Sequence, residues 1–225
     1  MGKLSRPTPL TLLEFPKLEP PDQDTLVSVI TPTIGRQDIL RCIDSVRAQT
    51  HKHVEHVIVA DGVEASYKLP IEPTATLGRN WSTPRTGPGA YATNVGWLLG
   101  HGGYLYTLPD DDWIEPNAIE TFIAAIGTAD FAFSQVEFST PVRTGCFRRG
   151  MESWISGSAD LFDGNHATPD QFFHRRLLEF GMYFASGRWE ASQPGQDVDL
   201  LAEWKRAGAT CVFVDQVLHH HTVNH

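Results

Sequence analysis

Residues 104–113 read YLYTLPDDDW, an apolar run followed by a proline and three consecutive aspartates. An apolar run of this length that ends in turn residues is typical of a buried β-strand. Three adjacent carboxylates repel one another, and oxygen ligands on a short loop suit a hard divalent cation such as Mg²⁺ or Mn²⁺. The stretch therefore predicts a strand that delivers Asp110, Asp111 and Asp112 to a cation site. A solvated acidic loop ahead of a helix is the alternative.

Apolar runs and helical periodicities alternate on both sides of this stretch. Strands are expected at 26–31 (ended by Pro32), 56–60, 104–108, 129–138 and 210–214, and helices at 38–49, 89–99, 116–126, 170–180 and 196–207. This alternation predicts an α/β fold with three layers, α/β/α, around a mostly parallel central sheet. Ligands of such sheets bind beyond the carboxyl ends of the strands, where Thr31, Thr33, Asp61 and the three aspartates fall.

Composition and charge narrow the class of protein. The chain has 225 residues, of which 41% are hydrophobic, and 18 Lys and Arg against 27 Asp and Glu give a net charge of −9. This acidity disfavours general nucleic-acid binding. The three cysteines are far apart and form no CxxC pair, which predicts reduced thiols. No apolar run approaches the about 20 residues of a membrane span, and Arg6, Pro7 and Pro9 interrupt the segment where a signal peptide is apolar. We expect a cytoplasmic protein with a proline-rich arm over 1–25 and a single domain over 26–225.

Three further groups of residues have either a functional or a purely structural interpretation. A glycine-bearing loop leads into the helix predicted at 89–99, whose expected core positions are Ala90, Val95, Leu98 and Leu99. Its N–H groups and Arg85 are suited to phosphate, although a plain loop is the alternative. Asp197 is either a general base or a carboxylate favoured by the helix dipole. The histidines at 219–221 either ligate an ion or belong to a frayed polar tail.

Taken in order, six stretches resemble the family 2 glycosyltransferases of the GT-A fold. They are VSVITPT at 27–33, IDSVRAQT at 43–50, VIVADG at 57–62, residues 87–96, residues 104–116, and QDVDL at 196–200. The resemblance implies a Rossmann-like GT-A domain with a nucleotide-sugar-binding half over 26–120 and an acceptor-binding half over 121–225. The implied activity is metal-assisted, inverting transfer of a sugar from a UDP-, GDP- or dTDP-sugar to an acceptor hydroxyl.

The resemblance also implies roles for individual residues. The donor would bind Thr31, Pro32, Thr33, Arg36, Asp61, Arg85, Asn94, Asp110 and Asp111. Mn²⁺ or Mg²⁺ would bind Asp111, Asp112, His219 and His221. Asp197 would be the catalytic base, and Trp154, Trp189 and Gln196 would face the acceptor. The chain departs from the family pattern at Pro109, where the metal motif has its first Asp, and at Gln196, where the motif of the base has Glu.

Two other functions remain open at this point. One is a protein of the same fold that holds a nucleotide sugar or glycan without turnover, an alternative with which the departures at Pro109 and Gln196 are compatible. The other is a sugar nucleotidyltransferase, but the glycine-rich, lysine-bearing signature of that class is absent from residues 31–36. The sequence indicates neither the sugar, nor the acceptor, nor an oligomeric state.

Overall fold

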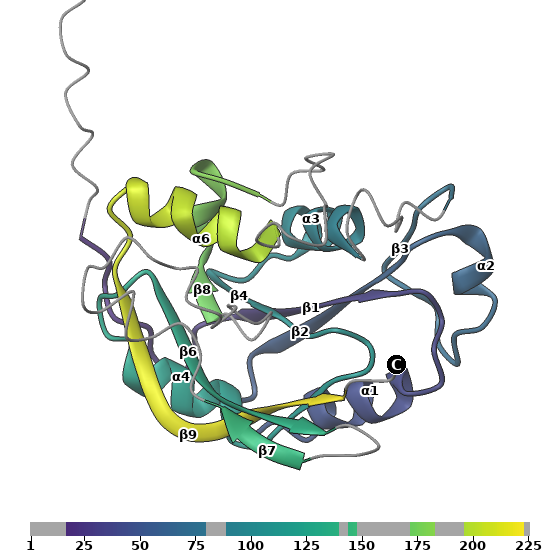
Figure 1. Ribbon diagram of the computed structural model, residues 1–225, viewed down its shortest axis with the longest axis horizontal. Helices are drawn as coiled ribbons and strands as arrows, with labels where there is room; N and C mark the ends of the chain where they lie inside the picture. Colours follow the sequence, from purple (N-terminus) through teal and green to yellow (C-terminus); the bar gives the residue numbers. More distant parts are fainter. Residues whose placement is uncertain (1–16, 80–88, 140–143, 148–171, 183–195, 223–225) are drawn as a thin grey trace, which may run out of the picture.

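The computed structural model describes residues 17–79, 89–139, 144–147, 172–182 and 196–222. In these ranges helices lie on both faces of one curled sheet (Figure 1). In chain order the elements are β1 (Val27–Thr33), α1 (Ile39–Arg47), β2 (Val54–Ala60), α2 (Val63–Ser66), β3 (Ala75–Thr76), α3 (Ala90–Leu99), β4 (Tyr104–Thr107), β5 (Trp113–Ile114), α4 (Ala118–Ile126), β6 (Phe131–Ser139), β7 (Thr144–Phe147), β8 (Phe172–His174), the 3₁₀ helix η1 (Arg175–Glu179), α6 (Gln196–Arg206) and β9 (Cys211–Thr222).

The described strands form a nine-stranded sheet in the order β3-β2-β1-β4-β8-β6-β9-β5, with β7 paired to β6. The first four strands along this order are parallel to one another, and so are β6 and β9. The antiparallel strand β8 joins these two groups. The predicted α/β fold with a mostly parallel sheet is confirmed.

The two larger apolar clusters hold the layers together, one on each face of the sheet. Cys42 and Val46 of α1 pack with Phe122 of α4 on one face. Trp97 of α3 packs with Trp204 of α6 on the other. Burial of a large apolar side chain contributes roughly 1.5–3 kcal/mol, so each cluster fixes its pair of helices against the sheet and leaves the strand ends to polar residues.

Strand β1 continues through Pro32, where the sequence predicts its end. The N–H of Leu108 donates to the carbonyl of Ile30, so the backbone N–H and C=O groups of Ile30 point toward β4. Because backbone direction alternates with period two, Pro32 points to the same side, beyond the last β1–β4 residue pair, Ile30 with Thr107. The missing N–H of the proline therefore costs no ladder hydrogen bond.

Helix α3 packs through small residues and Trp97, not through the leucines that its sequence suggests. Its buried residues are Ala90, Ala92, Thr93, Gly96 and Trp97. Leu98 and Leu99, predicted to be core positions, are 64% and 40% exposed. A Cβ on Gly96 would lie 2.2 Å from Cγ2 of Ile30, so the glycine lets the helix backbone approach β1 more closely than a leucine face would.

This close approach makes Gly96→Ala a destabilising change. An added methyl group must displace Ile30 of β1, and overpacking of this kind costs about 1–3 kcal/mol. Urea denaturation of the variant is expected to show a free energy of unfolding lower by that amount. Gly103→Ala is the matched control, because a Cβ there meets no described atom within 4 Å. An equal effect of both substitutions would contradict this packing.

The helix predicted at 170–180 is wrong. Among the described residues of this range, 172–174 form β8 and 175–179 form η1. The side chains of Phe172 and Phe173 belong to opposite apolar clusters. Consecutive residues reach opposite faces of a sheet only in a strand. Tertiary pairing with β4 and β6 thus overrides the helical pattern.

The C-terminal strand is longer than predicted. Strand β9 runs from Cys211 to Thr222 and pairs with β6 along its length, with a register shift beside Gln135. Figure 1 shows β9 curving around the sheet toward the end of the molecule where α1 lies. The histidines at 219–221 therefore belong to a paired strand, and the frayed-tail alternative is wrong.

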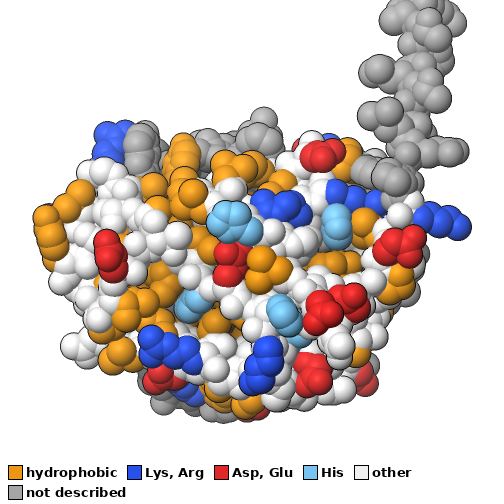
Figure 2. All heavy atoms as spheres, turned by 180° about the vertical axis from the view of Figure 1, so that it is seen from behind, with side chains coloured by type: hydrophobic (Ala, Val, Ile, Leu, Met, Phe, Trp, Pro, Cys, Tyr) orange, Lys and Arg blue, Asp and Glu red, His pale blue; other side chains and the backbone are white. Residues whose placement is uncertain are grey.

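The surface carries both signs of charge. Figure 2 shows acidic and basic side chains scattered among hydrophobic groups and several histidines on the face behind that of Figure 1. Within the described part of the chain, each helix is too short or too polar to cross a bilayer.

Candidate functional site

The carboxyl ends of β1, β2 and β4 meet at one edge of the sheet, as the topology predicts. The backbone N–H of Asp61, after β2, donates to the carbonyl of Thr33 at 2.8 Å. The hydroxyl of Thr33 donates to Oδ2 of Asp110, after β4, at 2.6 Å. Three predicted site residues that lie far apart in the sequence are thus in one network, and all three are buried.

Arg36 links the β1–α1 loop to the acidic loop. Its Nη1 donates to Oδ1 of Asp110 at 3.0 Å and to Oδ2 of Asp111 at 2.6 Å. Burial raises the pKa of the Asp111 carboxyl, the adjacent carboxylates of Asp112 and Asp110 raise it further, and Arg36 opposes them. The guanidinium therefore supplies positive charge that relieves repulsion among the first two aspartates.

Gly35 makes this loop possible. Its φ of +80° suits glycine, and a Cβ at this position would lie 2.8 Å from the carbonyl oxygen of Ala65. The N–H of Gly35 donates to Oγ1 of Thr33 at 2.9 Å. The turn thus holds Arg36 directly over the acidic loop.

Asp112 and two histidines of β9 form a cluster in which Asp112 and His219 are buried and His221 is partly exposed. Nε2 of His219 lies 2.9 Å from Oδ2 of Asp112, and Nδ1 of His221 lies 2.9 Å from both carboxylate oxygens. The N–H of Thr222 donates to Oδ1 at 3.1 Å. Burial favours a raised pKa of Asp112, but the hydrogen bonds from His219 and His221 outweigh it and hold the pKa below its usual value. Asp112 is therefore a carboxylate near neutral pH.

Tyr106 supports this cluster from β4. Its hydroxyl lies 2.8 Å from Nδ1 of His219, the ring nitrogen that does not face Asp112. A hydrogen bond to the second nitrogen fixes the orientation of an imidazole and is the usual support of a histidine ligand. The sequence pattern assigns Tyr106 only to the strand core, and strand pairing reveals its second role.

The donor set of this cluster fits a divalent ion. Single ligand atoms of Asp112, His219 and His221 all lie within 4.8 Å of one another. A carboxylate with two imidazoles suits Mn²⁺ better than Mg²⁺, which prefers oxygen ligands and retains water. Of the four predicted metal ligands, the structure brings these three together, while the Asp111 carboxylate contacts Arg36.

His220 faces the other side of β9 and joins a different network. Its ring stacks on Trp113 at 3.5 Å between centroids. Its two nitrogens lie 2.7 Å from carboxylates of Glu115 and Glu137. The three consecutive histidines are therefore divided by strand alternation, with His219 and His221 at the cluster and His220 pinning β5 to β6.

Thr31 lies beneath the site instead of on its surface. The residue is fully buried. Its Oγ1 lies 2.8 Å from Nε2 of His56 on β2 and 3.5 Å from Sγ of Cys42 on α1. Burial, together with the nearby charge of Arg47, lowers the pKa of His56 to about 4.

This shift predicts a pH dependence of stability. Unfolded His56 binds a proton near its ordinary pKa of 6.5, whereas the folded protein resists it until about pH 4. Stability is thus complete above pH 6.5 and falls as pH drops through this window, by about 3 kcal/mol for this group. Urea denaturation at pH 7 and pH 4.5 is expected to show a smaller loss in His56→Gln than in the unsubstituted protein. Equal losses would contradict the assignment.

Two further predicted donor contacts border the start of α3. A Cβ on Gly89 would lie 3.5 Å from the Pro32 ring, so Pro32 abuts the beginning of this helix. Asn94 is half-buried, one turn into α3. Both residues lie on the side of β1 opposite Thr31, since Pro32 and Thr31 point to opposite faces of the strand.

The remaining predicted residues lie outside what the structure describes. Arg85, Trp154 and Trp189 fall outside the described residues. Gln196 and Asp197 open helix α6, whose backbone is described there but whose side chains are not. Their roles stay predictions.

Comparisons with known proteins agree with this architecture. Residues 28–184 match the sequence model described as "Glycosyl transferase family 2". The chain is 33% identical over 106 residues to "Glycosyltransferase GlyA" of Streptococcus pneumoniae serotype 4, covering 46% of this chain and 15% of that protein. It is 32% identical over 145 residues to an "Uncharacterized glycosyltransferase" of Rickettsia felis, covering 63% and 23%. The chain thus spans less than a quarter of the length of these two relatives.

Solved structures share the fold at low sequence identity. S. aureus TarS 1–349 in complex with UDP gives a TM-score of 0.63 at 17% identity, over 88% of this chain and 61% of that one. The mannosyltransferase PcManGT from Pyrobaculum calidifontis, in complex with GDP-Man and Mn²⁺, gives 0.60 at 15% identity, over 95% and 62%. The fold is therefore of the GT-A type, as the sequence resemblance implies.

Proposed function

Because the chain belongs to glycosyl transferase family 2, we propose that it transfers a sugar from a nucleoside-diphosphate sugar to an acceptor hydroxyl. The observation that carries the proposal is the Asp112–His219–His221 cluster beside the network of Thr33, Asp61 and Asp110. A GT-A sheet binds its ligand at this edge, and here the edge holds a carboxylate and two imidazoles, ligands suited to a divalent ion.

For the donor, we propose that the nucleoside lies over the carboxyl ends of β1 and β2. Asp61 would orient the base and ribose, because a carboxylate at this edge accepts hydrogen bonds from ribose hydroxyls. Thr33 would border the nucleoside and hold Asp110 through its hydroxyl. The side chain of Arg36 is about two-fifths exposed, so its guanidinium would contact the diphosphate while it keeps its ion pairs with the acidic loop. The neighbours in complex with UDP and GDP-Man support a nucleotide ligand of this class.

Asp112, His219 and His221 would hold Mn²⁺, with Tyr106 orienting His219. The bound ion would supply positive charge for the diphosphate of the leaving group. The buried chain Tyr106–His219–Asp112 keeps the carboxylate ionised and the imidazole fixed before any ligand arrives. Preorganised charge of this kind is effective because it needs no rearrangement during the reaction.

Asp197 would act on the acceptor. A carboxylate at the beginning of α6 would take the proton of the acceptor hydroxyl while that oxygen attacks the anomeric carbon. The carbon–oxygen bond to the donor phosphate breaks as the new glycosidic bond forms, and this single displacement inverts the anomeric configuration. Trp154, Trp189 and Gln196 would border the acceptor.

The proposal is tested with a panel of UDP-, GDP- and dTDP-sugars. Release of nucleoside diphosphate is expected with at least one donor in Mn²⁺ and is expected to stop in EDTA. Thermal shift with the same nucleotides measures binding separately, since a ligand that binds the folded state raises its apparent stability. If nucleotides bind but no donor releases its nucleoside diphosphate in the presence of hydroxyl acceptors, the proposed enzyme activity is wrong. The protein would then be one that binds nucleotide sugars without turnover.

A further inference from the structure

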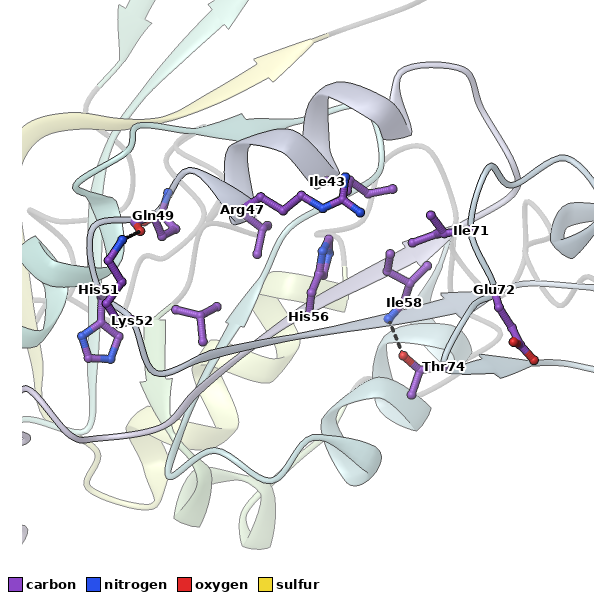
Figure 3. A pocket seen from close by; sticks show the side chains of 12 residues that line it. Ile43, Arg47, Gln49, His51, Lys52, His56, Ile58, Ile71, Glu72 and Thr74 are labelled. Carbon is purple, nitrogen blue, oxygen red and sulfur yellow. Dashed lines mark hydrogen bonds between the residues drawn. The ribbon is translucent and has the colours of Figure 1, made fainter.

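A cavity lies between α1, β2 and the segment 71–74, and its lining contains none of the three aspartates of the acidic loop (Figure 3). Its volume is about 300 Å³, which is enough for a small organic molecule. Its apolar lining residues are Ile43, Val46, Val54, Ile58 and Ile71. The proposed transfer reaction uses none of these residues, so the cavity needs its own explanation.

Positive charge prevails in this cavity. Arg47 and Lys52 line it, against one carboxylate, Glu72. The guanidinium of Arg47 lies 3.7 Å from the exposed carboxylate of Asp44, a surface ion pair of little strength. In Figure 3, Arg47 extends from α1 over the middle of the cavity, while Lys52 and Glu72 lie toward opposite ends. An anion at the centre would therefore meet Arg47 first.

His56 stands in the middle of the cavity floor. It points from β2 toward α1, beside Arg47 (Figure 3). Its Nε2 lies 2.8 Å from Oγ1 of Thr31. Among the described residues, no group forms a hydrogen bond with its Nδ1. The lowered pKa keeps the ring neutral at pH 7. In the tautomer that accepts from the Thr31 hydroxyl at Nε2, the ring proton resides on Nδ1 and is available as a donor to an anion beside the ring.

We propose that this cavity binds a small organic anion, with its charged group between Arg47 and His56 and its apolar body against Ile58 and Ile71. Arg47 and His56 lie beside each other in the lining of the cavity, and the side chains of Ile58 and Ile71 lie next to them. A carboxylate with an aromatic or aliphatic body matches this division. The site is distinct from the proposed donor site and does not depend on glycosyl transfer.

Three small probes test the negative charge and the apolar part of the ligand separately. Benzoate carries both features, benzylamine has the same ring with the opposite charge, and inorganic phosphate lacks the apolar body. NMR titration of the full chain with ¹⁵N-labelled histidine is expected to show benzoate shifting Nδ1 of His56 and binding more tightly than either other probe. Absence of benzoate binding at millimolar concentration, or equal or tighter binding of benzylamine or phosphate, would overturn the proposal.

A substitution assigns the binding to this cavity. Arg47→Gln is expected to weaken benzoate binding roughly tenfold, the value of one charge-assisted hydrogen bond. Arg206→Gln is the matched control, because Arg206 is equally exposed and also pairs with an acidic residue on its own helix. Both arginines lie at the surface, so both variants are expected to fold. Equal effects of the two substitutions would place benzoate elsewhere and refute the site.

Discussion

Asp112→Asn is expected to abolish Mn²⁺ binding and to lower the rate of sugar transfer by roughly 10²–10³-fold. The amide keeps the shape of the side chain but removes the negative charge that faces His219 and His221 at 2.9 Å. Titration of Mn²⁺ followed by its EPR signal measures the first effect. Nucleoside diphosphate release measures the second.

Asp111→Asn is the matched control for this experiment. It removes the same charge from the adjacent residue, whose carboxylate contacts Arg36 instead of the histidines. Its Mn²⁺ affinity is expected to fall less than tenfold. If Asp111→Asn loses Mn²⁺ as completely as Asp112→Asn, then the family resemblance, which assigns Asp111 as a ligand, is the better guide. Retained Mn²⁺ binding in Asp112→Asn would contradict the proposed centre directly.

Asp197→Asn is expected to leave donor and Mn²⁺ binding intact and to reduce transfer by about 10²–10⁴-fold, the usual contribution of a general base. The amide cannot take up the proton of the acceptor hydroxyl, whereas the proposed donor site lies at the ends of β1, β2, β4 and β9. Thermal shift with the nucleotide reports binding, and single-turnover kinetics with a saturating donor report the chemical step. The expected signature is a fall in the rate constant with an unchanged donor affinity.

Asp199→Asn is the control that distinguishes loss of the proposed base from loss of a negative charge near the start of α6. It lies two residues further along α6 and removes the same charge near the same helix start. Transfer in this variant is expected to stay within a few-fold of the unsubstituted rate. Full activity in Asp197→Asn would contradict the assignment of Asp197 as the base. Equal losses of activity in Asp197→Asn and Asp199→Asn would mean that only the local negative charge matters.

Much of the architecture follows from local pattern. The run 104–108 and the helices at 38–49, 89–99, 116–126 and 196–207 form near their predicted bounds, because apolar periodicity and terminal Gly and Pro residues act over a few residues. Errors arise where distant partners decide the outcome. The pair Phe172-Phe173 becomes a strand because β4 and β6 lie on either side of it.

The site shows the same division. The acidic loop after β4 follows directly from YLYTLPDDDW, and the topological rule correctly gathers Thr33, Asp61 and Asp110 at one sheet edge. The topological rule does not predict the contact between Asp112 and β9, since 107 residues separate Asp112 from His219. Arg36 is predicted as a donor contact, yet its ion pairs with Asp110 and Asp111 depend on how the Gly35 turn bends.

The sequence by itself determined an α/β sheet and a carboxylate-rich loop at its edge, because each follows from patterns within short segments. Six such segments, in order, carry the resemblance to one family. Only the tertiary structure decided which aspartate meets which histidine. Strand alternation directs His219 and His221 toward Asp112 and His220 toward Glu115 and Glu137. The register of β9 against β5 and β6 determines that choice, and a shift of one residue would reverse it.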